Sequence, residues 1–92
     1  MNITLFQLGQ IVATPGALQA LSDHEISPAS LIHRHVTGDW GDLCEVDKQQ
    51  NATGIVHGMR IFSSYQISAD MKIWIITEAD RSSTTLLLPN EY

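Results

Sequence analysis

The apolar pattern of this chain changes period at Gly58, and this change limits the folds that are open to it. Between residue 15 and Gly58 the apolar residues recur at helical spacing, as they do across residues 31–36. From residue 59 to 67 apolar and polar residues alternate, which is typical of a strand with one buried face. Residues 71–77 are almost continuously apolar and β-branched, as in a central strand. Helices followed by strands predict an α+β domain, with N-terminal helices packed on one face of a C-terminal sheet.

The predicted helices have clear start and stop signals. They span about 15–23, 28–37 and 40–57. The first two begin where a capping residue precedes proline, at Thr14-Pro15 and at Ser27-Pro28. Asp39 is predicted to cap the third helix, and Gly58 is predicted to end it.

The predicted strands follow one another closely. They span about 59–67, 71–78 and 83–88. Because only short turns connect them, we expect a three-stranded antiparallel meander. Residues 3–13 also read as extended, with Gly9 as an interruption, so this segment is a candidate for an extra edge strand. A chain of 92 residues has room for one domain, residues 1–92.

The predicted core combines the apolar helix stripes with the strands. It comprises Leu18, Leu21, Leu31, Ile32, Val36, Leu43, Ile61, Ile73, Trp74, Ile75 and Leu87. His35 falls on the apolar stripe of the second helix and is predicted to be packed there, whereas His33 is predicted to be exposed.

The negative charge of the chain is concentrated in residues 23–47. This segment holds six of the ten acidic residues and only one basic residue, Arg34, which accounts for the whole net charge of −5. Such a balance argues against direct binding of nucleic acid, which needs clustered Lys and Arg, and favours a basic protein partner. The candidate partner-binding residues are Asp39, Trp40, Asp42, Glu45 and Asp47. Trp40 either anchors the third helix or forms an exposed hot spot, and the sequence leaves both readings open.

Catalytic and metal-binding patterns are weak in this sequence. Cys44 is the sole cysteine, which excludes an internal disulfide and suits a reducing cytoplasm. Cys44 with His35 or His57 could be drawn as a nucleophile and its base, but the position of Cys44 beside Leu43 predicts a small buried hydrophobe. His33 and His35 would point away from each other on a helix. We therefore predict no enzyme activity, no metal and no cofactor.

No stretch approaches the ~18 apolar residues of a membrane span, so a cytoplasmic protein without membrane contact is expected.

Three longer runs carry a resemblance to a known family. They are QLGQIVATPGAL from residue 7, HVTGDWGDL at 35–43 and ITEADRSSTTLLLPNEY at 76–92. Together they resemble a family of small bacterial proteins, usually labelled plasmid-related, that are carried on plasmids and other mobile elements. The resemblance implies a cytoplasmic accessory protein of mobile DNA, and it implies no particular activity.

These observations lead to one principal function hypothesis and two alternatives. The principal hypothesis is a non-enzymatic accessory protein of mobile DNA that binds a protein partner. One alternative is an acidic decoy that inhibits a host defence complex, such as a restriction or CRISPR effector. The other is a small hydrolase that uses Cys44. Exposed strand edges or the polar third helix could also support a homodimer.

Overall fold

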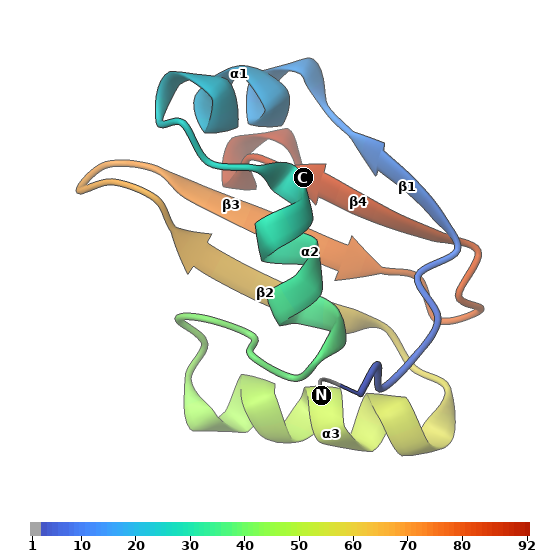
Figure 1. Cartoon of the computed structure of the whole chain (residues 1–92). Coiled ribbons are helices and arrows are strands. Elements are labelled where there is room, and N and C mark those ends of the chain that lie inside the picture. Colours follow the sequence, from blue (N-terminus) through green and yellow to red (C-terminus); the bar gives the residue numbers. More distant parts are fainter. Residues whose placement is uncertain (1–2) are drawn as a thin grey trace.

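The computed structural model describes residues 3–92 and contains three α-helices and a four-stranded sheet (Figure 1). The elements are β1 (Gln10–Ala13), α1 (Pro15–Asp23), α2 (Pro28–Val36), α3 (Glu45–His57), β2 (Ile61–Gln66), β3 (Lys72–Thr77), β4 (Ser83–Leu87) and the short 3₁₀ helix η1 (Pro89–Glu91). The predicted α+β class is therefore confirmed, and the observed strands are slightly shorter than the predicted ones.

The sheet is mixed, with strand order β1-β4-β3-β2. Strands β2, β3 and β4 pair antiparallel in sequence order, but β1 adds a fourth strand that runs parallel to β4. The prediction of a three-stranded antiparallel meander is thus wrong for the sheet as a whole. The candidate edge strand forms only at its C-terminal end, where Gln10 N–H donates to Ser82 O and Thr14 N–H donates to Leu86 O. The extended N-terminal segment pairs with the edge that the last strand of the meander would otherwise leave open.

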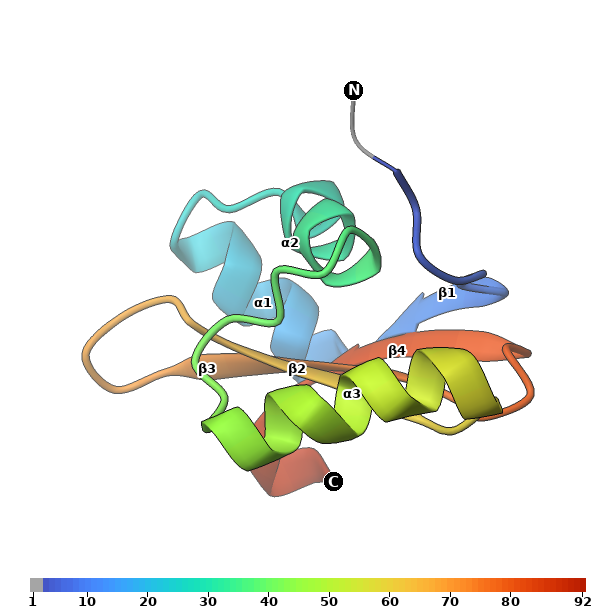
Figure 2. The same ribbon diagram turned by 90° about the horizontal axis from the view of Figure 1, so that it is seen from below.

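The helices do not all cover one face of the sheet. Helices α1 and α2 lie on one face, whereas α3 runs beside the edge strand β2 and η1 lies on the opposite face (Figure 2). The prediction that all three helices pack on one face is therefore wrong for α3. The reason is the composition of α3, which buries only Asn51 and Gly54 and has no apolar stripe to place on a sheet face.

The third helix begins five residues later than predicted, at Glu45 instead of residue 40. Asp39 does not cap it, and Cys44 occupies the N-cap position without a side-chain hydrogen bond. The residues before the helix are extended because they pair with β2, where Gly41 forms a bridge with Ser64. The other three predicted boundaries are confirmed. Thr14 Oγ1 accepts a hydrogen bond from Ala17 N–H, Ser27 occupies the N-cap of α2 without a side-chain hydrogen bond, and Gly58 ends α3 in the left-handed conformation.

The core lies between the sheet and helices α1 and α2. The predicted core residues that are buried are Leu21, Leu31, Val36, Ile61, Ile73, Ile75 and Leu87, and Tyr65 and Leu86 join them. Leu18 is 48 % exposed, which corrects the prediction, because α1 buries the stripe formed by Ala17, Ala20 and Leu21 instead. Ile32, Leu43 and Trp74 are only partly buried.

Candidate functional site

Asp39 stabilises the connection between α2 and α3 through hydrogen bonds. Its carboxylate accepts two hydrogen bonds from Arg34, with Nε–Oδ2 at 2.6 Å and Nη2–Oδ1 at 3.2 Å. The hydrogen bond from Arg34 lowers the pKa of Asp39 below its ordinary value. The carbonyl oxygen of Asp39 accepts a hydrogen bond from Tyr65 Oη at 2.7 Å. Asp39 therefore orients the connection instead of offering a free carboxylate to a partner.

The side chains of Trp40 and Asp42 also form hydrogen bonds within the chain. Trp40 is half-buried, and its Nε1–H donates to the carbonyl oxygen of His35 at 3.2 Å. Asp42 Oδ2 accepts a hydrogen bond from Gln66 N–H at 2.9 Å. Of the two readings of Trp40, the structure favours the anchor, although Trp40 anchors the connection before α3 and not the helix itself.

The outer edge of β2 is closed by these residues and by Asn51. Ser64 N–H donates to Trp40 O, and Asp42 N–H donates to Ser64 O. Asn51, which is 3 % exposed, binds Phe62 at both ends of its amide: Nδ2 donates to Phe62 O at 2.6 Å and Oδ1 accepts from Phe62 N–H at 3.0 Å. The polar residue on α3 thus takes the place of a neighbouring strand.

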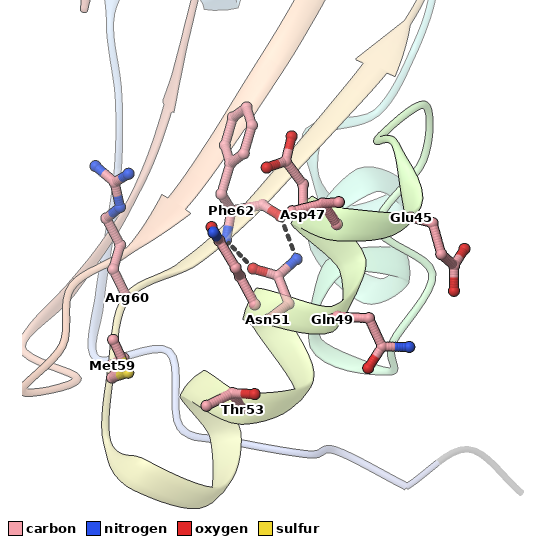
Figure 3. A pocket seen from close by; sticks show the side chains of 10 residues that line it. Glu45, Asp47, Gln49, Asn51, Thr53, Met59, Arg60 and Phe62 are labelled. Atoms are coloured by element: carbon pink, nitrogen blue, oxygen red, sulfur yellow. Dashed lines mark hydrogen bonds between the residues drawn. The ribbon is translucent and has the colours of Figure 1, made fainter.

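Glu45 and Asp47 lie in a different environment, at the start of a hollow between α3 and β2. The hollow has a volume of about 760 Å³. Its lining residues are Glu45, Val46, Asp47, Gln49, Gln50, Asn51, Thr53, Met59, Arg60 and Phe62. In Figure 3, Asp47 stands beside the ring of Phe62, whereas Glu45 points outward at the start of the helix. Of the five candidate site residues, these two alone line the hollow.

The hollow also exposes apolar surface. Val46 is 66 % exposed and Met59 is 53 % exposed. Phe62 packs edge-on against Trp74 with ring centroids 5.0 Å apart, so the hollow opens onto the sheet face that α1 and α2 do not cover. Sequence reasoning did not single out Val46 and Met59 as surface candidates, because the alternation from residue 59 placed Met59 on the buried face of a strand. Their exposure becomes visible only in the structure, where β2 begins at Ile61 and α3 buries no apolar stripe.

His35 forms the centre of a buried chain of hydrogen bonds. Thr84 Oγ1 donates to Leu8 O at 2.7 Å, so it accepts the hydrogen bond from Thr77 Oγ1. Thr77 Oγ1 therefore accepts from His35 Nε2–H at 2.9 Å, and Nδ1 accepts from Ser63 Oγ at 2.5 Å. Every donor in this series of hydrogen bonds is used once, which assigns the neutral Nε2–H tautomer to His35. Burial lowers the pKa of His35 to about 4.

The nucleophile and base pairs drawn from the sequence are not assembled. His35 is buried as predicted, but both ring nitrogens are bound by hydroxyl groups, and neither His35 nor Ser63 has any exposed surface. His57 lies at the far end of α3 from Cys44, about 19 Å away for 13 residues of helix. Within residues 3–92 no three His, Cys, Asp or Glu side chains gather in a way that could hold a metal ion.

Cys44 is exposed, which corrects the prediction of a small buried hydrophobe. Because the thiol is at the surface, a maleimide reagent should label folded protein at nearly the rate of the denatured chain. The measurement is the labelling rate by mass spectrometry with and without denaturant. A rate about tenfold or more slower in the folded protein would contradict the exposed position of Cys44.

Comparison of the chain with protein-family models, with curated proteins and with solved structures returns no match. The relation to plasmid-related proteins therefore stays a prediction. Among the helices of residues 3–92, none is both long and apolar enough to cross a membrane.

Proposed function

We propose that this chain is a non-enzymatic accessory protein of mobile DNA that acts by binding a protein partner. The partner presents a basic segment with apolar side chains to the hollow between α3 and β2. The observation that carries this proposal is the position of Glu45 and Asp47 beside exposed Val46 and Met59 at the same hollow.

The charge of the hollow supports a basic segment. Within residues 3–92, Glu45 and Asp47 take part in no ion pair, whereas Asp39 is paired with Arg34. Two carboxylates in the first turn of α3 would attract Lys or Arg side chains and speed the encounter. The apolar residues beside them would contribute the desolvated contacts on which most binding energy depends.

The role in mobile DNA rests on the resemblance of the three sequence runs and not on the hollow. The acidic-decoy alternative receives less support, because a decoy needs many free carboxylates and Asp39 and Asp42 are bound within the chain.

Site-specific photo-crosslinking tests the proposed function. A photo-reactive amino acid replaces Val46 at the hollow, and in a control protein it replaces Val56, which is 76 % exposed on the same helix. Both proteins are expressed in bacteria that carry the gene in its natural setting, and the crosslinked peptides are identified by mass spectrometry.

We expect the Val46 probe to crosslink a Lys- or Arg-rich segment of another protein that the Val56 probe does not reach. The proposal fails if the Val46 probe yields no specific product, or if the crosslinked segment is acidic.

A further inference from the structure

The two edges of the sheet are treated differently by the fold. The edge of β2 is closed by Asn51 and by the connection before α3. Strand β1 forms the other edge, and no element of residues 3–92 lies beyond it in the sheet (Figure 1). An open edge presents unpaired backbone groups that can bind a further strand.

The backbone groups on this open edge belong to Ile11 and Ala13. In a parallel pair, alternate residues of a strand bond to the neighbouring strand. Gln10 and Thr14 direct their amides toward β4, where Ser82 O and Leu86 O accept them. Ile11 and Ala13 alternate with the residues that face β4, so their N–H and C=O groups point outward.

Strand β1 itself carries no charged side chain, although the exposed carboxylate of Glu91 lies just beyond its C-terminal end, where it accepts a hydrogen bond from Thr14 Oγ1 at 2.6 Å. The first 22 residues contain no Asp, Glu, Lys, Arg or His, although the whole chain carries a net charge of −5. Ile11 is 49 % exposed and Val12 is 39 % exposed. Exposed edge strands usually carry Lys, Pro or a bulge that prevents further pairing. Strand β1 contains no charged residue and no proline.

We propose that β1 pairs antiparallel with β1 of a second copy of this chain, so that two sheets become one continuous sheet. The two-fold axis passes beside Val12. Ile11 then exchanges two hydrogen bonds with Ala13 of the second copy, and Ala13 exchanges two with Ile11 of that copy. This register uses all four outward backbone groups, whereas a register centred on Ala13 would bring Pro15, which has no N–H, into the ladder.

The charge distribution favours a second copy as the occupant. Two copies with a net charge of −5 repel each other, but the acidic excess lies in residues 23–47 and strand β1 carries no charged side chain. The acidic turn of α3 lies at the β2 side, at the far end of the strand order. The side chains are also self-complementary, because the large Ile11 lies opposite the small Ala13 and Val12 lies opposite itself.

Cysteine crosslinking of the purified chain tests this register. All variants carry Cys44→Ser, which removes the sole native thiol. In the proposed register the two copies of residue 12 form a non-hydrogen-bonded pair with Cα atoms about 4.5 Å apart, within disulfide range. Residue 11 of the two copies is about 8 Å apart, which is beyond that range. Val12→Cys should form a disulfide-linked dimer under mild oxidation, and Ile11→Cys should not.

The mass in solution provides the second measurement. Light scattering should give about twice the chain mass of 10.2 kDa for the parent protein and for Val56→Lys, a surface control. Val12→Lys places two like charges opposite each other and should be monomeric, with an unchanged circular dichroism spectrum. A monomeric parent, a dimeric and folded Val12→Lys, or faster crosslinking at residue 11 than at residue 12 would each overturn the proposal. If Val12→Lys does not fold, the comparison of Val12→Cys with Ile11→Cys in the crosslinking experiment tests the proposal.

Discussion

Replacing Asn51 by alanine should lower the free energy of unfolding by about 2–4 kcal/mol, a large part of the stability of a domain of this size. The side-chain amide of Asn51 satisfies both the N–H and the C=O of Phe62. Without it, two backbone groups beneath α3 lose their partners, and each unpaired buried group costs about 1–3 kcal/mol. The measurement is urea denaturation followed by circular dichroism.

Gln50 supplies the matched control, because it is exposed on the same turn of α3. Gln50→Ala should change the free energy of unfolding by less than about 0.5 kcal/mol. Hydrogen exchange adds an internal control: the Phe62 amide should exchange faster in Asn51→Ala, whereas the Ser64 amide keeps its partner, Trp40 O. Equal stability of Asn51→Ala and Gln50→Ala would show that Asn51 does not hold the β2 edge.

Lowering the pH from about 6.5 to about 4 should destabilise the protein by about 3 kcal/mol through His35. Burial lowers the pKa of His35 from 6.5 in the unfolded chain to about 4 in the folded one. Above pH 6.5 the imidazole is neutral in both states, so it adds no pH dependence. Between these values the unfolded chain binds a proton that the folded chain does not, and unfolding becomes more favourable. Below about pH 4 both states are protonated, and the loss is complete.

The His35→Gln variant isolates this effect from that of the carboxylates. Glutamine does not titrate, so the variant should be less stable than the parent at pH 7, and the difference should shrink as the pH falls to 4. The pKa of Asp39 is lowered by the hydrogen bond from Arg34, so its contribution is lost at still lower pH. A stability difference that does not change between pH 7 and pH 4 would contradict the buried, neutral state of His35.

Local signals in the sequence predicted most of the fold. The errors lie where contacts between segments distant in sequence determine the structure. Thr14, Gly58 and the alternation after Gly58 act within a few residues, so their elements were found. The late start of α3 follows from pairing with a distant strand, because residues 40–42 form backbone hydrogen bonds with the edge of β2. The predicted cap at Asp39 is a local pattern and could not reveal this pairing with β2.

The candidate site was only partly visible in the sequence for the same reason. The acidic segment was found, but charge alone did not distinguish Asp39, which binds Arg34, from Asp47, which lines the hollow. The hydrogen-bonded chain around His35 joins one helix, three strands and the N-terminal segment. Its members, including Ser63 and Thr77, follow no sequence spacing. Such networks can be recognised only once the strand register is known.

The most direct test of the proposed binding site is the association rate between this chain and the basic segment crosslinked at Val46. The variant Glu45→Lys with Asp47→Lys reverses the charge at the hollow. The control, Asp70→Lys with Glu78→Lys, changes the net charge by the same amount in exposed turns outside it.

Rates are compared at about 0.01 M and about 0.15 M salt, where charges act over about 30 Å and about 8 Å respectively. We expect the hollow variant to associate about tenfold or more slowly than the control at low salt, and the difference to shrink at high salt. Equal rates for the two variants at low salt would contradict a binding site for a basic partner at the hollow.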